Sequence, residues 1–189
     1  TERASVCPIP NKTHPFFNTW TSCSAITEIT EHLTVGHGEI DIIISDRGIF
    51  DALCWFEWLN VNPSKANSYL ADTEYEALRG FLTMKFWRQC LDLVYIFTVS
   101  PEKSLKREYA SLLTDRTGSI MNKSVLSGYN EAIGAAQQRF TDSFRRLKNI
   151  DTSELSADEV SYQVTSEVLD ALRDMLEERV AYFPEESTR

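Results

Sequence analysis

A clear strand signal in this chain is Ile40-Asp41-Ile42-Ile43-Ile44-Ser45-Asp46-Arg47-Gly48, an apolar run that ends in an acid, a base and a glycine. A second run of this kind is Leu93-Val94-Tyr95-Ile96-Phe97-Thr98-Val99, which leads directly into Ser100-Pro101-Glu102. Both runs are apolar on both faces, as strands are when helices cover each side of a parallel sheet. We therefore expect the strands Ile40–Ser45 and Leu93–Val99 to lie parallel in one sheet.

Helical patterns alternate with these strands. The apolar positions, caps and breakers predict helices over residues 25–33, 49–59, 73–89 (with a capping box of Thr73 and Glu76), 101–113, 125–147, and a closing helix after the capping box of Ser156 and Glu159. Asn62-Pro63 offers one more helix start, Pro8–Ser24 reads as irregular, and a third, short strand is expected at Lys148–Asp151. Strands that alternate with helices predict an α/β fold, a parallel sheet flanked by helices.

Composition limits the classes of protein that this chain can represent. It has 189 residues, 42% of them hydrophobic and 25% charged, which suits one sizeable domain (residues 1–183) followed by a disordered tail (184–189). The net charge of -9 argues against nucleic acid or an anionic membrane as partner. No apolar run approaches the roughly 20 residues that span a bilayer, and the four cysteines form no CxxC pair. A soluble protein of the cytoplasm is expected.

Ligands of open parallel sheets sit beyond the carboxyl ends of the strands, so the residues there are the first candidates for a site. In this sequence they are Glu2-Arg3, Asp46-Arg47, Ser100 and Asp151-Thr152. An acid in the place of Asp46 can hold Mg²⁺, which bridges nucleotide phosphates. The guanidinium of Arg47 offers a fork of donors for a phosphate or a phosphate-accepting hydroxyl. The structural alternative is an acid at a helix start that pairs with its neighbour.

Three further charged residues are candidates for phosphoryl-transfer chemistry. Arg107 lies early in the helix after the second strand and Arg116 in the polar loop that follows, where a basic lid could close over a nucleotide. Glu2 follows what resembles a strand end and could act as a general base. The structural alternatives are a solvated helix face for the two arginines and a frayed terminus for Glu2.

One expected element of a nucleotide site is missing from the sequence. No Gly-x-x-x-x-Gly-Lys-Ser/Thr occurs, and none of the 7 glycines precedes a lysine. That loop supplies the backbone cradle and the lysine for the β- and γ-phosphates. Because the first residue is Thr1 and the opening resembles a strand exit, we expect the domain to be incomplete at its N-terminus.

Several of these motifs, taken in order, resemble the deoxynucleoside-kinase and thymidylate-kinase branch of the P-loop kinases. The resemblance rests on the following segments: Asp46-Arg47-Gly48-Ile49-Phe50-Asp51, Tyr95–Glu102 with Arg107 behind it, the lid region with Arg116, Leu126-Ser127-Gly128-Tyr129 and Ile150-Asp151-Thr152-Ser153. It implies a three-layer P-loop kinase fold whose N-terminal P-loop unit is missing. Asp46 would then contact Mg²⁺ and Arg47 the acceptor, with Glu2 as the candidate base and Arg107 and Arg116 on the phosphates of ATP.

The function that this resemblance implies is transfer of a phosphoryl group from ATP, with Mg²⁺, to a small acceptor such as a nucleoside or nucleotide. The complete domain would perform it, whereas this chain alone would be inactive. Two alternatives stay open: an ATPase of the same fold with a regulatory role, and a non-catalytic remnant that binds a partner through the same crevice. Expected partners are a nucleotide and a small-molecule acceptor, and a homodimer is left open.

Overall fold

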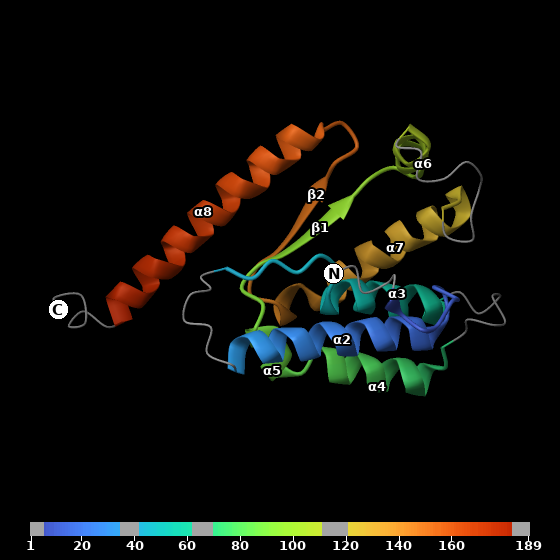
Figure 1. Cartoon of the computed structure of the whole chain (residues 1–189), viewed down its shortest axis with the longest axis horizontal. Coiled ribbons are helices and arrows are strands. Elements are labelled where there is room, and N and C mark those ends of the chain that lie inside the picture. The colour runs from blue at the N-terminus through green and yellow to red at the C-terminus, as the bar shows by residue number, and fades with distance from the viewer. Residues whose placement is uncertain (1–5, 35–41, 62–69, 111–120, 183–189) are drawn as a thin grey trace. The chain divides into compact units, whose positions relative to one another are not determined.

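The computed structural model describes residues 6–34, 42–61, 70–110 and 121–182, with side chains described up to residue 178. Contacts divide the chain into two compact units, one formed by Thr1–Ile96 with Ser100–Ile150 and the other by Phe97–Val99 with Asp151–Arg189. The described part is mostly helical and carries a two-stranded parallel sheet (Figure 1). The fold is therefore mixed α/β, as the alternation of patterns predicts.

Helix α3 (Ile49–Val61) is the centre of the first unit. Nine of its 13 residues are buried, and it packs against α2 (Pro15–Thr34), α4 (Asp72–Leu82) and α7 (Lys123–Phe140) (Figure 1). A helix that is apolar on all sides must be covered on all sides, which explains its central place. The predicted buried helix over residues 49–59 is confirmed.

Helix α2 begins earlier than the sequence pattern suggests, so the expectation of an irregular segment up to Ser24 is wrong from Pro15 onward. Pro15 is the first residue of the helix, where the missing amide hydrogen costs nothing and the fixed φ angle suits a helix. The helix also buries Phe17 and Ala25. Proline thus acts here as a helix start rather than as a breaker.

The predicted single helix over residues 73–89 is two helices in the structure, α4 (Asp72–Leu82) and α5 (Lys85–Gln89). The break falls at Thr83, whose hydroxyl donates to the carbonyl oxygen of Arg79 at 2.8 Å. A threonine that bonds back to the preceding turn competes with continuation of the helix. The capping acid is also shifted, because Glu74 rather than Glu76 accepts the backbone N–H at the helix start, that of Ala71.

The sheet consists of β1 (Val94–Thr98) and β2 (Leu147–Asp151). The N–H of Val94 donates to the carbonyl oxygen of Arg146 at 2.9 Å and fixes the start of the pairing. Two of the three predicted strands are therefore present. Helix α6 (Pro101–Ala110) follows β1, and the hydroxyl of Ser100 accepts the N–H of Lys103 at 3.4 Å as the predicted cap.

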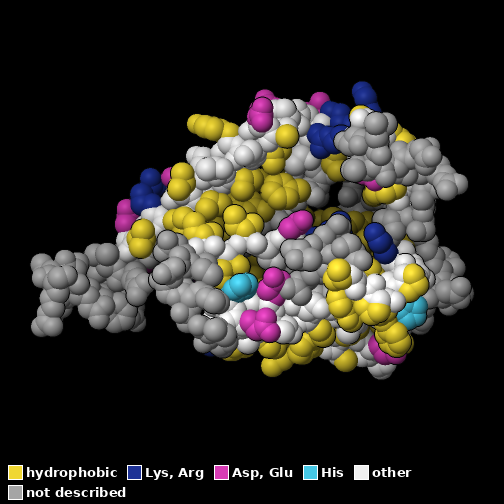
Figure 2. All heavy atoms as spheres, viewed as in Figure 1, with side chains coloured by type: hydrophobic (Ala, Val, Ile, Leu, Met, Phe, Trp, Pro, Cys, Tyr) yellow, Lys and Arg dark blue, Asp and Glu magenta, His cyan; other side chains and the backbone are white. Residues whose placement is uncertain are grey.

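The predicted strand Ile40–Ser45 is not formed over its described residues, 42–45, so the expected pairing with β1 is wrong. Ile42, Ile43 and Ile44 are exposed, Ile44 to 90%. The sheet of the described part contains β1 and β2 alone, so residues 42–45 make no ladder hydrogen bonds with it. Figure 2 shows that hydrophobic side chains are present at the surface on one face of the molecule.

Two further elements are described, the short 3₁₀ helix η1 (Thr141–Ser143) and, in the second unit, α8 (Ala157–Tyr182). The predicted capping box of α8 is confirmed. The N–H and hydroxyl of Ser156 both donate to Glu159 Oε2 at 2.7 Å, while the Ser156 hydroxyl accepts the N–H of Glu159. These bonds lower the pKa of Glu159. Among the described helices, none has the length and apolar composition to cross a membrane.

Candidate functional site

The candidate site begins with the turn that leads into α3. Arg47 adopts a positive φ of 60°, and it is the one described residue other than glycine that does so. The hydroxyl of Ser45 donates to the carbonyl oxygen of Arg47 at 2.9 Å, and the carbonyl oxygen of Gly48 accepts the N–H of Ala52 at 3.1 Å. A left-handed arginine is uncommon, and such conformations concentrate at functional turns. Asp46 and Arg47 are both exposed.

Asp51, in the first turn of α3, is the third charged residue at this place. Burial raises the pKa of its carboxyl group, and the charge of Asp46 raises it further. The hydroxyl of Tyr129 donates to Asp51 Oδ1 at 2.8 Å, and both this bond and the charge of Arg47 act in the opposite direction. The structure thus brings Asp46, Arg47 and Asp51 into one electrostatic group with Tyr129.

Tyr129 reaches this group from α7 and is held by aromatic neighbours. Its ring stacks on Trp55 with centroids 4.4 Å apart, and Trp55 meets Trp58 edge to face at 5.5 Å. Burial and the neighbouring Asp51 keep the pKa of Tyr129 well above its ordinary value, so its hydroxyl remains a hydrogen-bond donor. The aromatic cluster therefore fixes the partner of Asp51 in place.

The five site residues predicted from the sequence lie in different parts of the chain. Asp46 and Arg47 lie together before α3, Arg107 is exposed on α6, and Glu2 and Arg116 lie outside the described residues. Arg107 is not among the charges that shift the pKa of Asp51, whereas Arg47 and Asp46 are. Of the five predicted site residues, the described part brings two together.

The sequence alone predicts no role for Asp51 or Tyr129. Both stand in segments that carry the resemblance, but 78 positions separate them, and no local spacing pairs such residues. One available signal was the presence of an acid in the first turn of a helix that is otherwise nearly all apolar. Buried acids need a partner, which predicts a hydroxyl or a cation from another element.

Asp46 and Asp51 are the carboxylates that could serve a divalent cation here. Within the ranges that the structure describes, no group of three or more His, Cys, Asp and Glu side chains is arranged to hold a metal. Magnesium usually takes one or two protein carboxylates and completes its shell with water and phosphate oxygens. The exposed carboxylate of Asp46 fits that use. A cradle for the phosphates of ATP does not fit, since the sequence has no glycine-rich loop with a following lysine.

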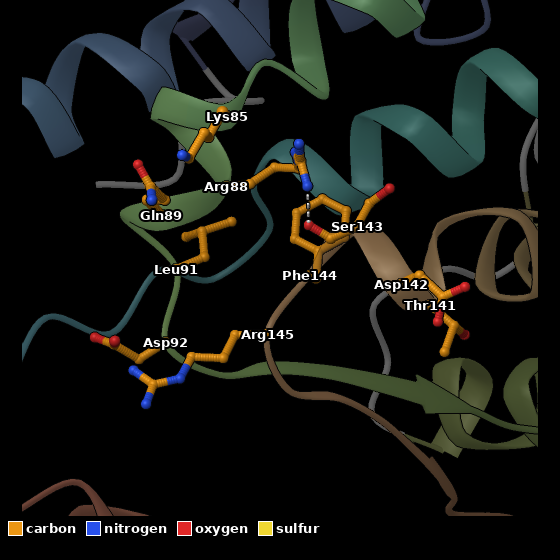
Figure 3. Close-up of a pocket in the computed structure, with 10 residues that line it drawn as sticks. All are labelled: Lys85, Arg88, Gln89, Leu91, Asp92, Thr141, Asp142, Ser143, Phe144 and Arg145. Atoms are coloured by element: carbon orange, nitrogen blue, oxygen red, sulfur yellow. Dashed lines mark hydrogen bonds between the residues drawn. The ribbon is translucent and has the colours of Figure 1, made fainter. Parts of the chain in front are cut away.

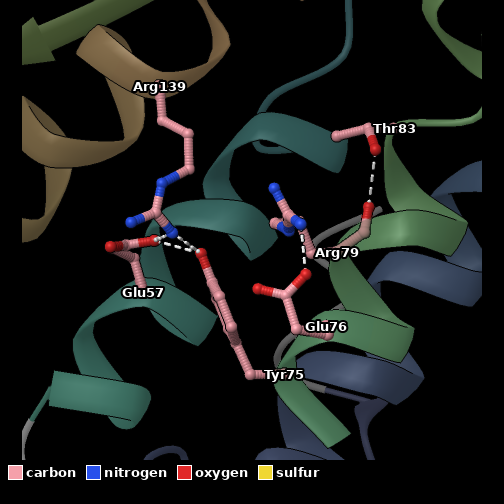
Figure 4. A network of polar contacts seen from close by, with 6 residues as sticks. All are labelled: Glu57, Tyr75, Glu76, Arg79, Thr83 and Arg139. Carbon is pink, nitrogen blue, oxygen red and sulfur yellow. Dashed lines mark hydrogen bonds and ion pairs between the residues drawn. The ribbon is translucent and has the colours of Figure 1, made fainter. Parts of the chain in front are cut away.

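A second polar cluster lies in the same unit and joins a buried acid to an exposed arginine (Figure 4). Glu57 is buried in α3 and accepts hydrogen bonds from the hydroxyl of Tyr75 and from Arg139 Nη1, the latter at 3.0 Å. The guanidinium of Arg139 also lies 5.8 Å from the centre of the Tyr75 ring. Burial and the neighbouring carboxylate raise the pKa of Tyr75. The cluster ties α3, α4 and α7 together, and we assign it a structural role.

No protein-family model matches this chain, and neither curated proteins nor solved structures yield a match.

Proposed function

We propose that Asp46 and Arg47 form the metal and acceptor side of a site for phosphoryl transfer from ATP to a small acceptor, of the nucleoside or nucleotide class. The proposal rests on the turn before α3. In this turn the exposed acid Asp46 is followed by the exposed base Arg47, and the backbone of Arg47 is left-handed. The proposal assigns no phosphate cradle to these 189 residues, because the motif for one is absent from them.

The chemical roles follow from the side chains. The carboxylate of Asp46 would hold Mg²⁺, which neutralises charge on the phosphates of the donor. Arg47 would orient the acceptor through two parallel N–H bonds, which a lysine cannot reproduce. Asp51 and Tyr129 back this pair from α3 and α7. Arg107 and Arg116 remain proposed phosphate contacts, and Glu2 a proposed general base.

The proposal is tested by steady-state kinetics beside thermal melts, in a protein in which a phosphate-binding loop accompanies this chain. Arg47→Lys should lower turnover while the melting temperature stays unchanged, and Asp46→Asn should weaken the dependence of the rate on Mg²⁺. Full turnover in Arg47→Lys together with a lower melting temperature would show that Arg47 is a structural partner only.

Two measurements separate this proposal from its rivals. A screen of acceptors distinguishes a kinase from an ATPase, because the ATPase passes the phosphoryl group to water and yields no phosphorylated acceptor. Affinity for ATP in the same protein distinguishes either enzyme from a non-catalytic remnant.

A further inference from the structure

A pocket with a volume of about 700 Å³ lies in the first unit, and none of its lining residues belongs to the turn before α3 (Figure 3). Its walls are α5, the residues 91–92 just before β1, and the residues 141–145, which form η1 and continue toward β2. Leu91 and Phe144 contribute apolar surface to the lining. Pockets of 300–1,000 Å³ are the usual size of ligand sites.

The pocket has a fixed wall because Arg88 ties its two sides together. Arg88 Nε donates to the carbonyl oxygen of Thr83 at 2.6 Å, and Arg88 Nη1 donates to that of Ser143 at 2.7 Å (Figure 3). The guanidinium is thus oriented by the backbone of two separate segments. A cation that is already held in position loses little conformational freedom when a ligand arrives.

Basic residues outnumber acidic ones in the lining of the pocket, by Lys85, Arg88 and Arg145 to Asp92 and Asp142, in an otherwise acidic protein. Residues 77–91 contain three basic residues and no acid, although the chain as a whole has a net charge of -9. Two of the three, Lys85 and Arg88, line the pocket, whereas the third, Arg79, pairs with Glu76. Arg145 lines the pocket from the β2 side. An acidic group on a partner is the complement of this local charge.

Exposed apolar side chains adjoin the basic ones. Phe81 is 38% exposed, Met84 is 48% exposed and Phe86 is 56% exposed, all within six residues of one another and beside Lys85. The rings of Phe81 and Phe86 both meet Trp87 edge to face, at 5.8 Å and 4.9 Å. Exposed apolar side chains that lie together are a feature of surfaces that bind another molecule, and these three are candidates for such a surface.

We propose that the α4–α5 corner, defined by Phe81, Met84, Lys85 and Phe86 with the adjoining pocket, is a docking surface for an acidic, apolar segment of another protein. Acidic side chains of that segment enter the pocket toward Lys85 and Arg88, and its apolar side chains cover Met84 and Phe86. Asp92 and Asp142 also line the pocket, and their charge disfavours a surface of uniform negative charge such as an anionic bilayer. A polypeptide can present both signs of charge and amide groups to such a mixed lining.

The test is selection of a phage-displayed library of random 12-residue peptides against the whole 189-residue chain, followed by fluorescence anisotropy with the enriched peptides. We expect the enriched peptides to combine Asp or Glu with large apolar residues. Lys85→Glu and Phe86→Ser should each weaken their binding by about tenfold. Lys106→Glu on α6 and Leu169→Ser on α8 are matched controls, exposed like the test residues, and should leave binding unchanged.

Several results would overturn the proposal. They are the absence of enriched peptides, enrichment of peptides without acidic residues, or equal binding by the wild-type protein and Lys85→Glu. Sedimentation with phosphatidylserine vesicles adds a further arm, because vesicle binding that is lost in Phe86→Ser, without peptide binding, would assign the surface to a membrane. Thermal melts confirm that each variant is folded. None of these outcomes bears on the proposed roles of Asp46 and Arg47, which lie outside this corner.

Discussion

At the scale of single residues, the acid–base behaviour of Asp51 follows from its burial and from the hydrogen bond that it accepts from Tyr129. A carboxyl group whose pKa is raised on folding binds its proton more tightly in the folded chain than in the unfolded one. Its contribution to stability is therefore present below the unfolded value, 3.8, and is lost as the pH rises through the folded pKa. Above the folded pKa the charge of Asp51 costs stability, as charged groups at functional sites often do.

Asp51→Asn should therefore raise the melting temperature at pH 7, because the amide keeps an oxygen that accepts the hydroxyl of Tyr129 and carries no buried charge. The gain should shrink as the pH falls toward 3.8. Thermal melts across this range test the expectation, with Asp142→Asn, an exposed acid on η1, as the control. The same pH dependence in both variants would contradict the burial of the Asp51 charge.

A substitution of Arg139 tests the polar cluster that it forms with Glu57 and Tyr75. Replacing Arg139 by leucine leaves the buried carboxylate of Glu57 with the hydroxyl of Tyr75 but without its cation. Because the Arg139 side chain is 44% exposed and water screens its charge, the loss should be about 1 kcal/mol of unfolding free energy. Arg173→Leu removes an ion pair with Asp170 that is exposed on both sides, and it should change stability by at most about 0.5 kcal/mol. Urea unfolding measures both values, and equal losses would contradict the structural role of the cluster.

At the scale of elements, two glycines on α7 provide a matched pair. A Cβ on Gly128 would come within 3.0 Å of Trp58 Nε1, and Trp58 is only 1% exposed, whereas a Cβ on Gly134 would meet nothing within 4 Å. Gly134→Ala should stabilise the protein by about 1 kcal/mol through helix propensity. Gly128→Ala should instead destabilise it by about 1 kcal/mol or more, because the core cannot move aside.

Differential scanning calorimetry of the two alanine variants checks this pair. A lower melting temperature for Gly128→Ala and a higher one for Gly134→Ala is the expected result. A rise for both would mean that α3 and α7 are less closely packed at Trp58 than the structure has them.

The sequence predicts those elements whose signals are local. Helix α3 follows from its apolar density, α6 from Ser100-Pro101 and α8 from the box of Ser156 and Glu159. The expected strand Ile40–Ser45 is wrong over its described residues because a strand depends on a neighbour that no local pattern supplies. In the candidate site, the position of Asp46 and Arg47 directly after an apolar run marks them as site candidates from the sequence alone. The hydrogen bond between Asp51 and Tyr129 cannot be predicted in this way, because tertiary packing brings the two residues together.

At the scale of the whole molecule, the sequence provides charges for a metal and an acceptor but no glycine-rich cradle for the donor. We therefore expect this 189-residue chain to bind ATP weakly or not at all, even with Mg²⁺. Isothermal titration calorimetry tests the expectation. Binding in the micromolar range would show that residues of this chain hold the phosphates without such a loop.

The most direct test of the Asp46-Arg47 site is a nuclear magnetic resonance titration of this chain with nucleoside monophosphates and Mg²⁺, following the Arg47 Nε–H and Gly48 N–H signals. We predict saturable shifts of both signals. Arg47→Lys should abolish the shift at Gly48, and Asp46→Asn should remove its dependence on Mg²⁺. Arg173→Lys, an exposed position on α8, controls for loss of any arginine. Signals that stay fixed throughout the titration, or shifts at Gly48 that survive Arg47→Lys, would contradict the assignment of this turn as the acceptor site.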